Sequence, residues 1–326
     1  MTKSKIILVT GASTGIGRGI AIALASAGHQ VTITGRNQTT LDQVASDFKD
    51  QSGTGCAGKI VPKVCDHSDD KAVEKLFGEF EKLDVLINNA YSAVNVIAKV
   101  SKLSFWEIEP SVWDDVNNVG LRNHYRCSTF AARIMIKNKP EAGLIVNIGS
   151  AGGAMTLFNA CYGIGKEGKD RMAVEMGREF RKKRENVYAM ALWPGAVKTE
   201  KISAMYANPD GATLTSGGDP AKTDLNTQMF MDGESTTFSG LCLAEIVARM
   251  EDKKFMRSVN AKISWTCDLG KEFGLRDVDG RVIPSYIQMN VILKMAGWSK
   301  LSKFIPSFVK LPKFLFVSDA FGKRFR

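Results

Sequence analysis

Short apolar runs alternate with helical stretches along most of the chain. Strands are expected at residues 6–10, 30–34, 59–65, 85–88, 143–148, 187–192 and 261–267. Helices are expected between them, at residues 15–27, 40–48, 71–80, 113–135, 162–180 and 239–250. Repeated strand–helix alternation is typical of βαβ units, whose strands pair in parallel and whose helices cover both faces of the sheet. The sequence therefore predicts the α/β class with a doubly wound parallel sheet.

A glycine-rich turn, residues 10–17, joins the first expected strand to the first helix. Glycine lets the chain turn sharply and lets a phosphate approach the backbone, and the free N–H groups at a helix start attract the anion. The alternative is a tight turn with only a structural role. Between a strand and a helix, we expect this turn to bind a dinucleotide, as in a Rossmann domain. The residues predicted to line the site are Gly11, Ser13, Thr14, Gly15, Ile16 and Gly17.

The end of the second strand indicates which dinucleotide is bound. About 20 residues beyond the glycines, an acid binds the ribose 2′-hydroxyl of NAD(H), whereas an arginine accommodates the 2′-phosphate of NADP(H). Gly35 stands where the acid is expected, and Arg36 follows it. This arrangement predicts NADP(H) in preference to NAD(H). The alternative is that Arg36 is a solvated surface charge.

A phenol and an amine are expected on one face of a helix. Tyr162 and Lys166 are four residues apart, which is about one helical turn. A phenol with a pKa of about 10 is a poor acid or base at neutral pH, and a nearby ammonium group stabilises the phenolate. Ser150 follows the fifth strand, where its hydroxyl could hold a substrate oxygen. The three residues are predicted to be catalytic; taken singly, a surface helix pair and a strand-end cap are the alternatives.

Together these motifs resemble the short-chain dehydrogenase/reductase family over about residues 5–270. Further matching positions are Asp66, residues 88–90, and Pro194-Gly195 with Thr199. The resemblance implies that Tyr162 is the general acid in ketone reduction and the base in alcohol oxidation. It also implies that Lys166 lowers the pKa of Tyr162 and holds the nicotinamide ribose, while Ser150 positions the substrate oxygen.

The same resemblance implies cofactor contacts at seven further positions, which are Asp66, Asn89, Ala90, Pro194, Gly195, Val197 and Thr199. Asp66 would touch the adenine, and Asn89 and Ala90 the adenosine ribose or its surroundings. Residues of the segment 194–199 would contact the nicotinamide carboxamide. For Asn88 and Asn89, a hydrogen-bond cluster at the strand end is the alternative.

Three positions depart from the family pattern. Gly120 stands seven residues after Trp113, where the family has a helix asparagine whose backbone carbonyl anchors a relay water, and we expect the local bulge to be lost. Tyr91 replaces a glycine and is expected to narrow the pocket. Ser150 and Tyr162 are twelve residues apart, one fewer than is common, so a shorter intervening loop is expected.

The positive charge is concentrated at the C-terminus. The net charge is +10, of which +7 belongs to residues 285–326. The nearly neutral body removes the main support for nucleic-acid binding. The three histidines are scattered, so no metal site is predicted.

Residues 285–326 combine apolar clusters with lysines, a composition suited to lying in a membrane interface. The alternative is that the apolar residues pack on the domain or on a second subunit, with the lysines reaching into solvent. We expect residence on the cytoplasmic face of an intracellular membrane such as the endoplasmic reticulum, or otherwise in the cytoplasm. A homodimer is expected because related folds pair through helix faces.

These observations predict a dinucleotide-binding and catalytic domain over residues 1–280, with a substrate lid at 206–240, and a basic, apolar C-terminal extension over 281–326. The predicted function is an NADPH-dependent reductase of small lipophilic carbonyl compounds, or the reverse alcohol oxidation. Its lipophilic preference rests on the extension and on lid candidates, which are Met205, Tyr206, Met229, Phe230 and Met231. The alternative is a membrane-associated nucleotide-binding scaffold with little catalysis.

Overall fold

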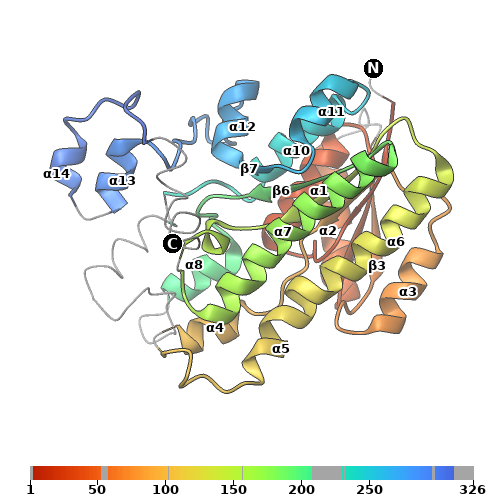
Figure 1. Cartoon of the computed structure of the whole chain (residues 1–326), viewed down its shortest axis with the longest axis horizontal. Helices are drawn as coiled ribbons and strands as arrows, with labels where there is room; N and C mark the ends of the chain where they lie inside the picture. The colour runs from red at the N-terminus through yellow and green to blue at the C-terminus, as the bar shows by residue number, and fades with distance from the viewer. Residues whose placement is uncertain are drawn as a thin grey trace.

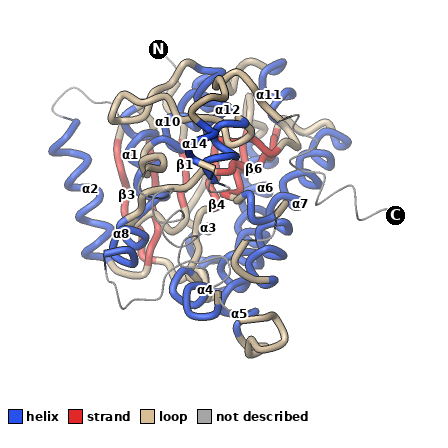
Figure 2. Tube along the Cα trace, turned by 90° about the vertical axis from the view of Figure 1, so that its left-hand side faces the viewer, coloured by secondary structure: helices blue, strands red, loops and turns tan. Residues whose placement is uncertain are grey.

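A parallel sheet lies at the centre of the computed structural model (Figures 1 and 2). The structure describes residues 3–52, 58–101, 103–155, 157–207, 230, 232–295 and 298–311. Within these residues the sheet has seven strands in the order β3-β2-β1-β4-β5-β6-β7. Their bounds are β1 Ile6–Val9, β2 Gln30–Gly35, β3 Lys59–Val64, β4 Val85–Asn88, β5 Gly143–Ile148, β6 Val187–Trp193 and β7 Ile263–Trp265. Every pairing is parallel, so the predicted fold class is confirmed.

Helices cover both faces of the sheet (Figure 1). One face packs against α1 (Gly15–Ser26), α2 (Gln38–Ser52), α10 (Phe238–Ala248), α11 (Lys253–Val259) and α12 (Thr266–Phe273). The other packs against α3 (Asp70–Gly78), α6 (Asn123–Asn138) and α7 (Ala160–Lys183). Alternation along β1 sends Ile7 and Val9 to the first core and Leu8 to the second. Both faces of the strands are therefore buried, which explains their continuous apolar runs.

The strand order places β1 beside β4, so successive crossovers leave these two strands in opposite directions. In doubly wound sheets, a crevice forms at this reversal, outside the carboxyl ends of the strands. The first edge strand, β3, contains Pro62. Proline cannot donate to the ladder, and an edge position tolerates it because one side of the strand has no neighbour.

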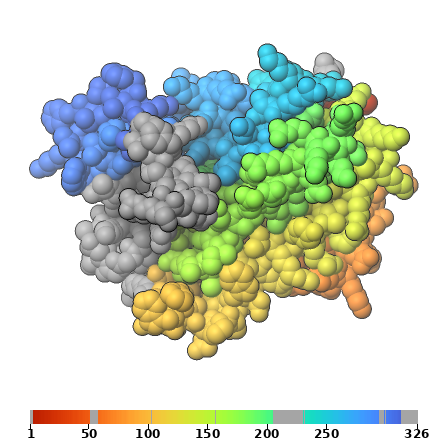
Figure 3. Space-filling model, viewed as in Figure 1, coloured from red at the N-terminus to blue at the C-terminus, as the bar shows by residue number. Residues whose placement is uncertain are grey.

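The C-terminal part begins by packing on the domain. Ile283 and Ile287 are buried, and Ile283 belongs to the main hydrophobic core. Beyond them, the described residues of 288–311 form a lobe with α13 (Met289–Met295) and α14 (Ser299–Ser302), which projects at one end of the molecule (Figures 1 and 3). The lobe closes where Gln288 pairs with Lys310 in an isolated antiparallel bridge.

The predicted lid falls largely outside the described residues. Residues 206 and 207 end α8 (Glu200–Ala207), while 208–229 and 231 are not described. The described remainder, 232–240, runs back to the core, where α10 begins at Phe238. Two lid candidates, Met229 and Met231, therefore lie outside the described part, and Met205 and Tyr206 belong to α8.

Candidate active site

The glycine-rich turn is held in a single shape by the neighbouring strand end. Gly11 has φ +63°, and a Cβ there would lie 2.7 Å from Ala90 Cα. Asn89 Nδ2 donates to Thr10 O at 3.0 Å and to Gly11 O at 2.8 Å. Thr10 Oγ1 in turn accepts the backbone N–H groups of Asn89 and Ala90, each at 3.0 Å. The side chain of Asn89 is thus engaged in shaping the turn.

Asn88 belongs to a second buried hydrogen-bond cluster just below. Its Nδ2 donates to Ser128 Oγ at 2.8 Å and to Asn147 Oδ1 at 2.9 Å. The alternative considered from sequence, a strand-end cluster, therefore describes the side-chain partners of both asparagines.

The N-terminus of α1 is occupied by a carboxylate from another element. No side chain of α1 caps this end, and its first turn has no acid. Instead Glu200, at the start of α8, accepts the Gly15 N–H through Oε2 at 3.0 Å and lies 3.8 Å from Arg18. An anion at a helix N-terminus is favoured by the free N–H groups and the helix dipole. The Glu200 carboxylate shows that this turn accepts an anion at the Gly15 N–H, which is the contact that a cofactor phosphate would make.

The end of β2, which was expected to select the cofactor, carries no acidic residue. Gly35 lies against Ser13, since a Cβ at Gly35 would be 3.1 Å from Ser13 Cβ. Arg36 follows and is exposed. Asp66 accepts the Ser68 N–H at 2.9 Å, and this bond, together with the charge of Arg36, holds the pKa of its carboxyl below the usual value. Arg36 is therefore an exposed charge close enough to Asp66 to favour its ionised form, next to the glycine that packs on Ser13.

Ser150 and Tyr162 meet directly. The Tyr162 hydroxyl donates to Ser150 Oγ at 3.0 Å, and Ser150 Oγ also accepts the Gly152 N–H at 3.2 Å. Asn159 caps α7 by accepting the Tyr162 N–H at 3.0 Å, which fixes the tyrosine in the first turn. The short spacing is accommodated by a 3₁₀ turn at Ala151–Gly153 and by Phe158, whose φ is +61°.

Lys166 lies beside the phenol, and a second lysine lies behind it. Lys166 Nζ is 5.5 Å from the centroid of the Tyr162 ring and 4.8 Å from that of Tyr91. Lys169 Nζ is 5.0 Å from the centroid of the same Tyr91 ring, and it forms a hydrogen bond with the Lys166 side chain. Lys169 is only 1% exposed. Asp170 is also buried, and its Oδ1 accepts the Trp193 Nε1–H at 2.9 Å. Two amines and a carboxyl therefore share one dry region under the tyrosine.

Burial dominates the ionisation of these groups. Together with the Asp170 charge and against the Ser150 hydrogen bond, it raises the pKa of Tyr162 to about 12. The lowering predicted from Lys166 alone is therefore not found in these surroundings. Burial also lowers the pKa of Lys166 to about 8, while Asp170 and the bond to Lys169 oppose that change. Burial raises the pKa of Asp170 to about 7.

Two of the departures from the family pattern contact each other. A Cβ at Gly120 would lie 2.7 Å from Tyr91 Cε2, so the Tyr91 ring occupies the space above this glycine. Gly120 lies in η2, a π-helical turn at Asn118–Arg122 between α5 (Val112–Asn117) and α6. The expected loss of the bulge is therefore wrong, and the single helix predicted over 113–135 is interrupted there.

The segment after β6 lies next to the glycine-rich turn. A Cβ at Gly15 would lie 3.5 Å from Thr199 Cγ2. Glu234 holds this segment: its carboxylate accepts the Gly195 N–H, its own N–H donates to Ala196 O at 2.8 Å, and Lys198 N–H donates to its carbonyl at 3.0 Å. Thr266 Oγ1 donates to Glu234 Oε2 at 2.6 Å. The segment 194–199, predicted from resemblance to contact nicotinamide, therefore has a fixed backbone.

An apolar cluster forms one wall beside the tyrosine. Ile97, Val116 and Ile202 are buried in it, from α4 (Val94–Val100), α5 and α8. Tyr162 and the lid candidate Phe230 pack against this cluster. The Tyr162 side chain therefore has hydrocarbon packed against it.

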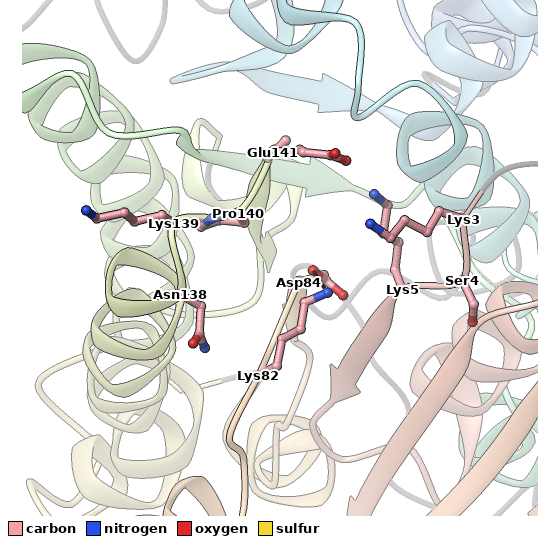
Figure 4. A pocket seen from close by; sticks show the side chains of 10 residues that line it. Lys3, Ser4, Lys5, Lys82, Asp84, Asn138, Lys139, Pro140 and Glu141 are labelled. Atoms are coloured by element: carbon pink, nitrogen blue, oxygen red, sulfur yellow. Dashed lines mark ion pairs between the residues drawn. The ribbon is translucent and has the colours of Figure 1, made fainter.

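A cavity of about 200 Å³ lies elsewhere (Figure 4). Its lining comes from residues 3–5, 82, 84 and 138–142, which precede β1, β4 and β5. In a parallel sheet these segments lie at the amino ends of the strands, opposite the edge that holds Ser150 and Tyr162. The cavity therefore does not belong to the site described above.

Comparison with known proteins identifies the class. A sequence model of the family described as short chain dehydrogenase matches residues 5–209. The chain therefore belongs to the short-chain dehydrogenase/reductase family, as predicted, and is an oxidoreductase that acts on alcohol or carbonyl groups.

Two relatives are similar over almost their whole length. Dehydrogenase/reductase SDR family member 1 of Mus musculus is 39% identical over 96% of both chains, and that of Homo sapiens is 39% identical over 95% of both. A solved structure from Beutenbergia cavernae, described as an NAD(P)-dependent gluconate 5-dehydrogenase with bound NADP at low occupancy, superposes with a TM-score of 0.63. It is 22% identical and covers 82% of this chain and 96% of its own, so it supports the fold.

The contact between Tyr91 and Gly120 predicts the effect of restoring the family residue. Gly120→Asn should lower the free energy of unfolding by about 1–3 kcal/mol, because the new side chain overlaps the Tyr91 ring. In a Tyr91→Gly background the same Gly120→Asn change should cost less, because the ring that it overlaps is absent. Urea denaturation measures both, with Gly78→Asn as the control, since a Cβ at Gly78 meets nothing within 4 Å. Equal stability of Gly120→Asn and Gly78→Asn would contradict the overlap.

Proposed function

We propose that the protein is an NADPH-dependent reductase of lipophilic carbonyl compounds, or catalyses the reverse oxidation of the alcohols. The observation that supports this most directly is the 3.0 Å hydrogen bond from the Tyr162 hydroxyl to Ser150 Oγ, beside the buried amine of Lys166. A proton donor, a second hydroxyl and a cation at one point are what reduction of a polarised carbonyl requires.

The residues divide the chemistry between them. When bound, the nicotinamide cofactor supplies or takes up the hydride. The Tyr162 hydroxyl gives its proton to the carbonyl oxygen, and the Ser150 hydroxyl holds that oxygen by a hydrogen bond. The ammonium group of Lys166 offsets the negative charge left on the phenolate. In the oxidative direction the same phenolate accepts the alcohol proton.

Three parts of the cleft fit the cofactor. The turn 11–17, where an anion already bonds Gly15 N–H, would hold its phosphates. Arg36, with no acid on the end of β2, favours a 2′-phosphate and hence NADP(H). The solved structure from Beutenbergia cavernae, which holds NADP at low occupancy, supports NADP(H) as a ligand that this fold can bind. The segment 194–199 would contact the nicotinamide half.

The lipophilic substrate class is supported by the apolar wall. Tyr162 and Phe230 pack against the cluster that includes Ile97, Val116 and Ile202. Burial of hydrocarbon contributes about 25 cal/mol per Å² of apolar surface, so apolar surroundings of Tyr162 favour an apolar substrate over a polar one.

Replacement of the proton donor separates catalysis from binding. Tyr162→Phe should lower kcat for NADPH-dependent reduction of a panel of aromatic and aliphatic ketones by about 10²–10⁴-fold, because the proton is lost while the ring stays. Affinity for NADPH, measured by fluorescence titration, should be retained. Absence of turnover in the wild type, with NADPH still bound, would favour the alternative of a nucleotide-binding scaffold.

The arginine at the end of β2 predicts the cofactor preference. Arg36→Ala should lower the affinity for NADPH by about tenfold or more and leave the affinity for NADH nearly unchanged, because only NADPH has the 2′-phosphate. Binding constants for both cofactors test this, with Arg171→Ala as a control, since that arginine pairs with Glu175 on the surface of α7. Equal weakening of both cofactors would refute the role of Arg36.

We also propose that the lobe 288–311 lies on a membrane surface. Trp298, Phe304 and Phe308 are 62%, 80% and 81% exposed. Lys300 and Lys303 lie between them in the chain. Within the residues that the structure describes, none of the helices has the length and apolar character needed to cross a bilayer. Exposed aromatic side chains fringed by lysines suit insertion at the level of anionic lipid headgroups.

Substitution in the lobe tests this in the full chain. Trp298→Ser/Phe304→Ser/Phe308→Ser should reduce sedimentation with phosphatidylcholine–phosphatidylserine vesicles by about tenfold or more, because it removes the inserting rings. Phe105→Ser/Trp106→Ser is the matched control, since this pair is also exposed but lies outside the lobe. Truncation after Gly280 is unsuitable because it also removes the core residue Ile283. Equal sedimentation of the triple variant and wild type would contradict the proposal.

A further inference from the structure

A tyrosine from the C-terminal part packs against the segment 194–199. The Tyr286 hydroxyl accepts the Ala196 N–H at 2.8 Å. Its ring lies directly against Gly195, where a Cβ would be 2.6 Å from Tyr286 Cε2. Two consecutive amides of the segment therefore have their acceptors in distant parts of the chain: Glu234 for Gly195 and Tyr286 for Ala196.

Tyr286 is itself fixed in place. Its ring stacks on Trp265, with centroids 5.3 Å apart, and Trp265 meets Trp193 edge-on at 5.0 Å. Ile283 and Ile287 are buried on either side of it in the chain. Ser285 Oγ donates to Asp268 Oδ1 at 3.0 Å and ties the same stretch to α12. The Tyr286 ring is thus held against β7, and the preceding residue is tied to α12, which keeps the hydroxyl at the segment.

We propose that Tyr286 is a positioning residue for the nicotinamide half of the cofactor. The inference rests on the proposed function in one respect, namely that the segment 194–199 contacts the nicotinamide. It also extends the catalytic unit to residues 283–287, beyond the predicted domain boundary at residue 280.

The expected effect is confined to one half of the ligand. Without the hydroxyl, the Ala196 amide loses its acceptor in a buried place, which favours displacement of the segment. The adenosine half binds at the turn 11–17 and near Arg36, which Tyr286 does not contact. A ligand that lacks the nicotinamide should therefore not sense the change.

Tyr286→Phe in the full chain tests this with two probes. Affinity for NADPH should fall by about five- to tenfold, while affinity for adenosine 2′,5′-bisphosphate should stay within about twofold, both measured by calorimetric titration. Tyr125→Phe is the matched control, because Tyr125 is exposed on α6. Tyr286→Phe keeps the ring stacked on Trp265. Tyr286→Leu removes that stacking as well and should lower the NADPH affinity further.

A second measurement needs no cofactor. Amide hydrogen exchange of the segment 194–199 should be faster in Tyr286→Phe, while exchange in β5 stays unchanged. The positioning role alone would be overturned by either of two results. One is that Tyr286→Phe weakens the binding of both ligands equally, and the other is that the wild type and the variant bind NADPH with the same affinity. Absence of NADPH binding by the wild type, with adenosine 2′,5′-bisphosphate bound, would overturn this inference and the proposed function together.

Discussion

Parallel strand pairing is the constraint on which the site depends. Because the strands run in one direction, their carboxyl ends meet at one edge, and the loops after them meet too. The glycine-rich turn follows β1, Asn89 follows β4, Ser150 follows β5 and the segment 194–199 follows β6. The two bonds from Asn89 Nδ2 to the turn are a direct result of the pairing of β1 with β4. A different strand order would place these loops apart from one another.

Burial then sets the chemistry of what has been brought together. Removal from water disfavours charge, so it lowers the pKa of Lys166 and raises those of Tyr162 and Asp170. The groups moderate one another, because Asp170 favours the charged form of Lys166 but disfavours the phenolate of Tyr162. The Tyr91 ring adds a face on which both lysine amines lie. The proposed acid–base role of Tyr162 therefore depends on the whole cluster and not on one neighbouring amine.

Departures from a family pattern are better understood as pairs than singly. From sequence, Tyr91 and Gly120 each weaken the resemblance, whereas in the fold the ring of one fills the space that a side chain at the other would need. The shorter loop between Ser150 and Tyr162 is likewise closed by the turn at Ala151–Gly153 and the left-handed Phe158, and the two hydroxyls still meet. Such compensation involves contacts between distant parts of the chain, which no local pattern reports.

The sequence by itself determined the strands, their parallel arrangement and the positions of the glycine-rich turn, Ser150, Tyr162 and Lys166. These depend on local periodicity and on short spacings, which are visible within a few helical turns or one strand. The tertiary structure alone decided that Lys169 and Asp170 are buried, that Glu200 reaches Gly15, and that Glu234 holds the segment 194–199. It also decided the short helices α4, α8 and α12 and the place of Tyr286. Burial and pairing at these positions come from packing between segments far apart in the chain, and sequence spacing does not encode which segments will touch.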